Sequence, residues 1–491
     1  MQKAKQKYTL FTGKALALLI IPIVIEAALS MSLGMIDGLM ASYAKSGAGD
    51  NVLTAITGVD QIASLITQLF AAFGVGGAII TSQFLGAGKP DDANKSAKQL
   101  MVIMLIFALV ITAACLGLNN PIIRLLFGEA GDETLSNAYI YFYIISASFP
   151  FIALFNCCAA VLRAQRKSMN TMVSGIISFF LNIGFNAIFI YACNMGIAGV
   201  ALGTLLARIF PAFFTLFLVS RKNNAVRIKV FEKFRFDGGM IKRVLKLAVP
   251  SGIENSLFQL GKILVISFIT IGIYKVGELN IQSAANSVSY NINMVSSIVG
   301  NGVNTATLTV IGQAVGTGNI SQVKFYVRRM LLINYIGNAC CVAVTFGLSP
   351  VLLNFYNISG EARAVAWNCL LLCLPVQIVT YPLSFGMPAV LKANSDVKYV
   401  MAAAISSMII LRVGLCYILT CEWAGVKLGA MGLWIGMVSD WAMRGILFGG
   451  RYLSGKWKTK SGLLKPVEVY GESERVAEEQ LSEVFEKREN K

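Results

Sequence analysis

The chain lacks histidine altogether, and only 14% of its 491 residues are charged, whereas soluble proteins average about 25%. Without imidazole, a histidine proton relay and a histidine-based metal site are both excluded. A proton carried inside the protein must therefore bind a carboxylate or, less readily, a lysine. The sequence also has no Walker A motif and no Ser-His-Asp set, so neither ATP drive nor triad catalysis is indicated. We therefore expect neither an enzyme nor a bound cofactor.

The ten cysteines form no recognisable framework, because most lie in apolar runs and no Cys-x-x-Cys pair meets another at zinc-binding spacing. Cysteine within a membrane helix usually serves as a small packing residue. We therefore expect no disulfide and no metal site, apart from a possible Na⁺ site.

What the chain has in excess is apolar sequence: hydrophobic residues make up 56% of it and fall in long runs. A run of about 20 apolar residues crosses a bilayer as a helix, since a backbone in lipid must satisfy its own hydrogen bonds. The runs predict an all-α integral membrane protein with twelve transmembrane helices. The expected spans are residues 15–42, 54–84, 99–118, 136–162, 169–193, 197–220, 242–274, 282–314, 328–349, 364–391, 397–420 and 429–450.

The net charge of +17 does not indicate a nucleic-acid partner, because Lys and Arg gather on alternate inter-span segments. With the N-terminus inside, the inner segments carry most of these residues, as in membrane proteins generally. The few on outer loops are Lys45, Arg124, Lys275, Arg363 and Lys427. This pattern predicts a plasma-membrane protein, surrounded by lipid, with both termini cytoplasmic. The first span lacks a signal-peptide cleavage site and is expected to be retained.

The second half of the chain repeats the first. Pro22 and Glu26 return as Pro250 and Glu254. Further pairs are Ser-Gln-Phe-Leu-Gly-Ala-Gly-Lys at 82–89 with Gly-Gln-Ala-Val-Gly-Thr-Gly-Asn at 312–319, and Val-Leu-Arg-Ala at 161–164 with Val-Leu-Lys-Ala at 390–393. A duplicated membrane bundle is typical of a transporter whose site lies between the halves.

The repeat predicts two six-helix lobes of the same orientation, related by pseudo-two-fold symmetry about an axis along the membrane normal. We expect the first lobe over residues 1–225 and the second over residues 226–455. Residues 456–491 are rich in Glu and Lys and are expected to form a solvated cytoplasmic tail.

Carboxylates at membrane depth are few, and each should have a partner or a function, because a charge there costs at least about 2.5 kcal/mol. Asp37 has no basic residue within two turns of its own helix. It is either a proton or sodium carrier, or a carboxylate bonded to Ser or Asn on a neighbouring helix. Glu26, which follows Pro22, is either part of the cation-coupling site or a structural tie between helices.

Charged pairs are expected in the second half. Glu254 lies two turns before Lys262, and a buried pair between them would serve either the structure or the site. Asp440 and Arg444 are spaced as an ordinary structural pair on one helix.

Polar side chains also line single helix faces. Asn182 and Asn186 are four residues apart and share a face, and amides and hydroxyls recur in the second, eighth and tenth spans. Such faces either hold helices together or line a wet cavity. We expect a substrate cavity formed by Glu254, Lys262, Gln68, Asn286, Asn293, Gln377 and Tyr381.

The chain resembles the multidrug and toxic compound extrusion (MATE) family over most of its length. The features that carry the resemblance are Pro22 and Glu26, Met-Ile-Asp-Gly-Leu-Met-Ala at 35–41, Gln83 with Gly86 and Gly88, Gln313 with Gly316 and Gly318, Leu-Arg-Ala-Gln-Arg at 162–166, and Gly-Ile-Ala-Gly-Val-Ala at 196–201. The resemblance implies two lobes around a central cavity. It also implies alternating access and export of amphiphilic or cationic small molecules by a monomer in exchange for H⁺ or Na⁺.

The resemblance also implies a coupling site. Asp37 matches the family's coupling carboxylate, and Asn182 matches the Asn of an Asn-x-x-x-Asp pair whose second position is here Asn186. Asp37, Asn182 and Asn186 would form a Na⁺ site with one formal charge instead of two, and Na⁺ prefers charged oxygen ligands. A proton on Asp37 is therefore favoured.

Three other functions are open to a chain of this kind. A flippase for a lipid-linked saccharide or lipid belongs to the same superfamily, but such proteins typically have more than twelve spans. A membrane enzyme would need a group of polar catalytic residues in its loops, and the sequence lacks such a group. A channel fits a duplicated, proline-kinked monomer less well than alternating access does.

Overall fold

The computed structural model describes residues 10–42, 49–128, 131–228, 235–271, 276–356, 358–420 and 428–464, and within them nearly every residue is helical. The first half contains α2 (Gly13–Ser42), α3 (Gly49–Gly86), α4 (Pro90–Gly117), the short α5 (Asn119–Phe127), α6 (Asp132–Ala147), α7 (Phe149–Ala164), α8 (Ser168–Ala187), the π-helical η2 (Ile188–Ala192) and α9 (Gly196–Ser220).

The second half repeats this order. It contains α10 (Gly238–Ile271), α11 (Val276–Ser296), α12 (Ile298–Gly316), α13 (Ile320–Phe355), α14 (Gly360–Tyr381), the π-helical η3 (Pro382–Gly386), α15 (Met387–Ala393), α16 (Val397–Ser407), the π-helical η4 (Met408–Leu415), α17 (Cys416–Thr420), α18 (Ala430–Leu453) and the 3₁₀ turn η6 (Lys456–Thr459).

The predicted membrane fold is confirmed. In the described residues, nine helical stretches are long and apolar enough to cross a bilayer, and eleven are if each of two bent pairs counts as one span. The pair α6–α7 bends by 40° and the pair α11–α12 by 49°. The twelfth predicted span is α18, a 24-residue helix whose charged residues, Asp440 among them, lower its hydropathy. It packs among the others, against α14 and η3.

The outer surface has the character that lipid requires. Large apolar side chains are exposed around the bundle, including Leu109, Val110, Phe213, Phe217, Ile336, Val344 and Ile446. Apolar exposure of this extent is disfavoured in water and marks a surface that contacts membrane or protein.

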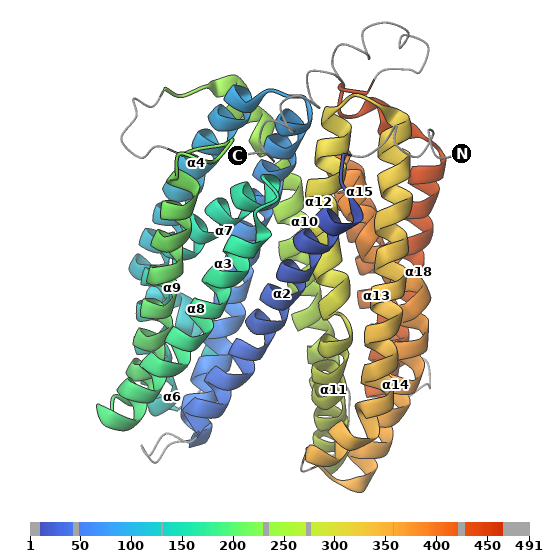
Figure 1. Ribbon diagram of the computed structural model, residues 1–491. Coiled ribbons are helices and arrows are strands. Elements are labelled where there is room, and N and C mark those ends of the chain that lie inside the picture. Colours follow the sequence, from blue (N-terminus) through green and yellow to red (C-terminus); the bar gives the residue numbers. More distant parts are fainter. Residues whose placement is uncertain are drawn as a thin grey trace, which may run out of the picture.

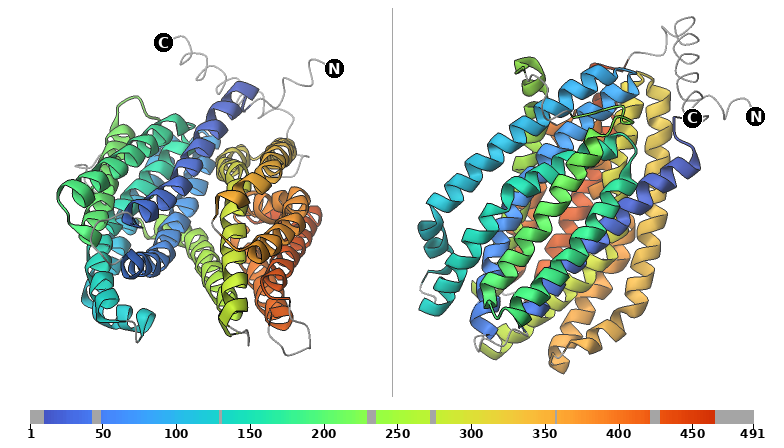
Figure 2. Two further views of the ribbon diagram at one scale, coloured as in Figure 1. Left: turned by 90° about the horizontal axis from the view of Figure 1, so that it is seen from below. Right: turned by 60° about the vertical axis from the view of Figure 1, so that its left-hand side comes forward.

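The two halves form a wedge (Figure 1). The helices α3 to α9 stand on one side and α10 to α18 on the other, and the two groups lie closer together at the top than at the bottom. The helix α2 runs obliquely between them, so that it contacts α8 in the first half and α12 in the second (Figures 1 and 2). The start of α2 and the end of α18 lie at the same end of the bundle.

At that end the halves make reciprocal contacts through a repeated glutamine. Gln83 Nε2 of the first half donates to Ala393 O at 2.9 Å, and Gln313 Nε2 of the second half donates to Ala164 O at 2.8 Å. Arg166 Nε adds a 2.9 Å hydrogen bond to Gln313 Oε1. Burial lowers the pKa of Arg166 to about 10, so it keeps its charge at neutral pH.

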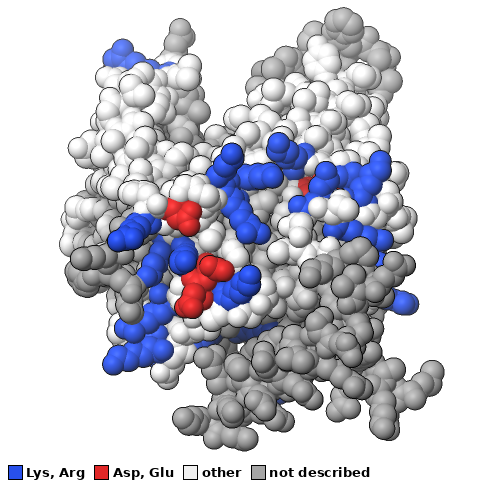
Figure 3. Space-filling view, turned by 90° about the horizontal axis from the view of Figure 1, so that it is seen from above, with Lys and Arg blue, Asp and Glu red and all other residues white. Residues whose placement is uncertain are grey.

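Glycine is needed where these helices cross. A Cβ atom at Gly86 would collide with the backbone carbonyl of Gln313, and one at Gly316 would collide with that of Gln83. The repeated Gln-x-x-Gly therefore forms one close helix crossing between the halves. This crossing, made by Gln83, Gly86, Gln313 and Gly316, is here called the interlobe contact. Figure 3 views this end of the molecule, where Lys and Arg outnumber Asp and Glu.

Two polar segments next to the bundle pack against it. The linker after α9 packs on the first half, where Val226 N donates to Gln165 Oε1 at 3.0 Å. The expected solvated tail begins with an anchored turn, because Trp457 is 1% exposed and stacks on Tyr452. The part of the tail after residue 464 lies outside the described residues.

Candidate functional site

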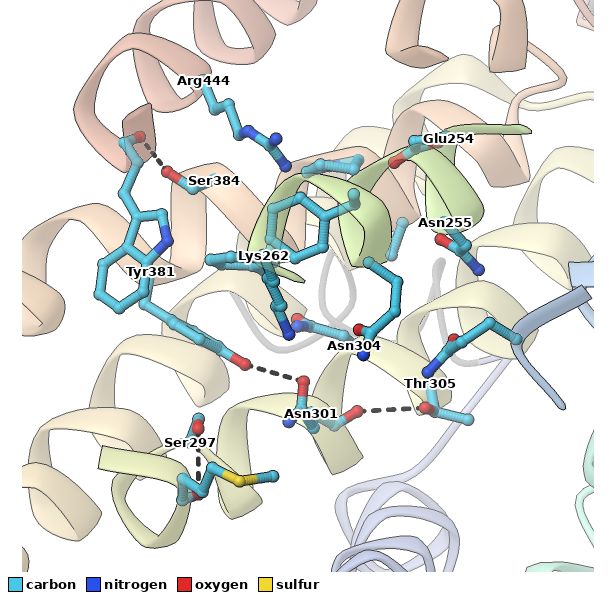
Figure 4. A pocket seen from close by; sticks show the side chains of 18 of the residues that line it. Glu254, Asn255, Lys262, Ser297, Asn301, Asn304, Thr305, Tyr381, Ser384 and Arg444 are labelled. Atoms are coloured by element: carbon cyan, nitrogen blue, oxygen red, sulfur yellow. Dashed lines mark hydrogen bonds between the residues drawn. The ribbon is translucent and has the colours of Figure 1, made fainter. Parts of the chain in front are cut away.

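A cavity of about 590 Å³ opens within the second half, in the size range of small-molecule sites. It is here called the second-half cavity (Figure 4). Its walls come from α10, α11, α12, α14, η3, α15, η4 and α18, with Met31, Gln68 and Val75 contributed by the first half. The bend at Ser297 and two π-helical stretches, η3 and η4, surround it, and π-helical turns are frequent at functional sites.

Five of the seven residues expected in the cavity line it: Glu254, Lys262, Gln68, Asn293 and Tyr381. Asn286 and Gln377 are not among its lining residues. Asn286 Oδ1 accepts a 3.1 Å hydrogen bond from Trp434 Nε1. Gln377 is fully buried, and its Oε1 accepts from Asn293 Nδ2 at 2.8 Å. Both amides form hydrogen bonds between helices. Spacing along one helix does not tell such a residue from one that lines a cavity.

The expected pair of Glu254 with Lys262 is not formed. Glu254 Oε2 instead lies 2.9 Å from Lys392 Nζ on α15, and Lys262 Nζ lies 3.3 Å from Tyr290 Oη. Eight residues along one helix place two side chains about 12 Å apart, which is too far for a direct pair. A residue on another helix is therefore the better partner.

The same pairing occurs in the first half. Arg163 Nη1 donates to Glu26 Oε1 at 3.1 Å, and Thr171 Oγ1 donates to Glu26 Oε2 at 2.8 Å. Arg163 is the residue that the repeat replaces by Lys392. The structure thus places Glu26 in a tie between α2, α7 and α8.

Asn182 and Asn186 do meet, as their spacing predicts. Both are fully buried on α8, and Asn186 Nδ2 donates to Asn182 Oδ1 at 3.2 Å. Asn182 Nδ2 also donates to Thr204 Oγ1 at 3.3 Å. Thr171, which holds Glu26, lies about 16 Å away along the same helix, so Glu26 is not a neighbour of the Asn pair. Asp37 lies on α2, but its side chain is outside the described part of the structure.

The sequence did not indicate a cluster of cations around Phe258. The ring of Phe258 lies 5.0 Å from Lys262 Nζ, 4.7 Å from Arg412 Cζ and 4.6 Å from Arg444 Cζ. An aromatic face attracts cations within about 6 Å. A signal for it was present in the sequence, because Lys262, Arg412 and Arg444 all fall within the expected spans.

The carboxylate behind this cluster is Asp440, which is fully buried. Its Oδ1 lies 2.9 Å from Arg444 Nε, and its Oδ2 lies 3.8 Å from Arg412 Nε. The expected pair with Arg444 is therefore present, and Asp440 is shared with a second arginine. Within the described ranges, no three His, Cys, Asp or Glu side chains gather as a metal site would require.

Comparison with known proteins identifies the family. The MatE family model matches residues 22–188 and again 250–418, one match in each half. The uncharacterized transporter YisQ of Bacillus subtilis is 26% identical over 89% of this chain and 94% of its own length. The probable multidrug resistance protein NorM of Thermotoga maritima is 23% identical over 92% and 94%.

A solved structure has the same fold. It is a MOP superfamily transporter from Pyrococcus furiosus, described as having a binding pocket of reverse polarity that suggests a different function. It superposes with a TM-score of 0.81 at 23% identity and covers 91% of this chain and 96% of its own. Since the family model matches more than half of the sequence, in two copies related as the internal repeat is, the chain belongs to the MatE (MATE) family of membrane transporters.

Proposed function

We propose that the protein is a secondary active antiporter that exports small amphiphilic molecules across the plasma membrane in exchange for H⁺ or Na⁺. The observation that carries this proposal is the second-half cavity of about 590 Å³, formed mainly by one half and reached by α2 and α3 of the other. Multidrug resistance proteins among the relatives support efflux as its use. The names of the relatives do not favour the flippase alternative.

The shape of the molecule supports alternating access. If the basic end faces the cytoplasm, the interlobe contact closes the cytoplasmic side and the wedge opens outward (Figures 1 and 3). Both termini would then be cytoplasmic. Transport requires a second state in which the interlobe contact opens, and ligands shift the two states through different affinities for each.

The coupling ion is proposed to bind at Asp37, with Asn182 and Asn186 nearby on α8. Protonation of Asp37 from outside and loss of the proton to the cytoplasm would carry one proton inward in each cycle, and the charge of Asp37 would differ between the two states. The buried amide pair supports H⁺ over Na⁺, because Asn186 adds no charge to a cation site. We propose that no other cofactor is needed and that the monomer is the working unit.

Gradient-driven uptake by inside-out vesicles tests this function. Three fluorescent probes are compared: ethidium as a cation, rhodamine B as a zwitterion and carboxyfluorescein as an anion. We expect a pH gradient to drive at least one of them, Asp37→Asn to abolish the driven part, and Asp132→Asn, an exposed carboxylate at the start of α6, to leave it unchanged. If neither a pH gradient nor a Na⁺ gradient changes the uptake of any of the three probes, the proposal is overturned.

A further inference from the structure

The charges around the second-half cavity do not balance. Its lining contains one acidic residue and four basic ones: Glu254, Lys262, Lys392, Arg412 and Arg444. Glu254 pairs with Lys392, and the only other described carboxylate paired with these cations is Asp440, which serves both arginines. Two more cations than carboxylates therefore surround one cavity.

Among the described residues, no further carboxylate balances the excess charge. Arg412 is 4% exposed, and its Nη1 makes no hydrogen bond to any described residue. Lys262 has the Tyr290 hydroxyl at 3.3 Å and no carboxylate within ion-pair distance among the described residues. In Figure 4 Lys262 and Arg444, from helices on different sides of the cavity, both point toward its centre. Unpaired cations removed from water are costly unless an anion compensates them.

We propose that the second-half cavity binds the anionic group of an amphiphilic substrate, with Lys262, Arg412 and Arg444 as the residues that recognise it. This inference rests on the proposed transport function and narrows its substrate class to compounds that carry a carboxylate, sulfonate or phosphate. A substrate whose only charge is positive would be repelled by the same cations. The expectation of cationic substrates that the family resemblance implies is therefore not followed here.

The rest of the cavity fits the apolar part of such a molecule. Phe258, Phe385 and Trp441 lie side by side, with ring centroids 6.4 Å apart for Phe258–Phe385 and 5.8 Å apart for Phe385–Trp441. Arg412 and Arg444 lie over the Phe258 ring, so the anion site and the aromatic wall adjoin. An aromatic acid would place its ring on this wall and its anion between the cations.

A structural role alone explains this arrangement less well. One arginine would be enough to neutralise Asp440 and tie α18 to its neighbours. A second arginine and a lysine add repulsion without adding a described carboxylate. The π-helical turn of η4 carries Arg412, and π-helical turns are frequent at functional sites.

The test is probe binding to purified protein, measured by fluorescence anisotropy without any gradient. We expect carboxyfluorescein to bind the wild type at least about tenfold more tightly than ethidium. Lys262→Gln breaks no ion pair with a described residue and should weaken carboxyfluorescein binding by about tenfold or more without weakening ethidium binding. Lys262→Arg should restore binding, and Lys246→Gln, an exposed site on the same helix outside the cavity, should change nothing.

Two results would overturn the inference: tighter binding of ethidium than of carboxyfluorescein to the wild type, or equal effects of Lys262→Gln and Lys246→Gln. Because no gradient is applied, neither result bears on antiport. Conversely, vesicles that transport no probe would refute antiport and leave the binding result intact.

Anionic lipid head groups have the same chemistry as a soluble anion. Short-chain phosphatidylglycerol is therefore added as a competitor. Competition that requires Lys262 would support the anion site with lipid as one source, and no competition would support it with a soluble source.

Discussion

Glu254 on α10 and Lys392 on α15 form a largely buried ion pair at 2.9 Å, and the same positions in the first half hold Glu26 and Arg163 at 3.1 Å. Each pair joins the first helix of a half, α2 or α10, to the end of a later helix of the same half, α7 or α15. The duplication has preserved the tie even though the cation changed from Arg to Lys. Both pairs lie next to the interlobe contact, because Arg163 precedes Ala164 and Lys392 precedes Ala393.

The first prediction concerns this pair. Glu254→Gln leaves Lys392 without its carboxylate and should lower the free energy of unfolding by about 1–3 kcal/mol, since both side chains are partly shielded from solvent. The exchange Glu254→Lys with Lys392→Glu should recover most of the loss. Thermal unfolding of the single and double variants measures the coupling, and strictly additive effects would show that the pair contributes nothing.

A second prediction concerns the interlobe contact. Gly86→Leu cannot be accommodated against the Gln313 backbone, so it should favour a state that is open at the basic end. Ser82 is buried in this structure. The variant Ser82→Cys should therefore react faster with a polar thiol reagent when Gly86→Leu is present than when Gly86 is unchanged.

The control for this experiment is Gly117→Leu, because a side chain at Gly117 meets no atom within 4 Å. Labelling is counted over that of the protein's own cysteines. Equal reactivity of Ser82→Cys in all backgrounds would refute the idea that this crossing closes the cytoplasmic side.

A third prediction concerns the amide pair. Asn186→Asp keeps the shape of a fully buried side chain and restores a second charge beside Asn182. The variant should bind Na⁺ better and show stronger stimulation by a Na⁺ gradient relative to a pH gradient. The ratio of the two stimulations in vesicles is the measurement. An unchanged ratio would show that Asn182 and Asn186 are not part of the coupling site.

A fourth prediction concerns Asp440. Asp440→Asn leaves Arg412 and Arg444 without their shared carboxylate and should destabilise the protein by about 3–5 kcal/mol, as the loss of a buried counter-ion does. Carboxyfluorescein should raise the melting temperature of this variant more than that of the wild type, because the anion replaces the missing charge. Asp132→Asn serves as control. A variant as stable as the wild type would mean that the arginines need no counter-ion.

The sequence alone was sufficient for everything that depends on local pattern. Apolar run length predicted the spans, and the repeat predicted two related halves. The four-residue spacing predicted that Asn182 and Asn186 share a face, where they indeed form a hydrogen bond. Such features depend on the periodicity of a single helix or on the similarity of two segments of the same chain, and both can be read without knowing how the helices pack.

Only the tertiary structure decided which polar groups meet. Glu254 finds Lys392 from a distant helix instead of Lys262 on its own. Asn286 and Gln377 face other helices instead of the cavity. Lys262, Arg412 and Arg444 reach one aromatic ring from three separate elements. The physical reason is that charge pairing in a membrane protein is set by the packing of helices far apart in the chain. Helical periodicity places a side chain on a face and does not say what lies opposite.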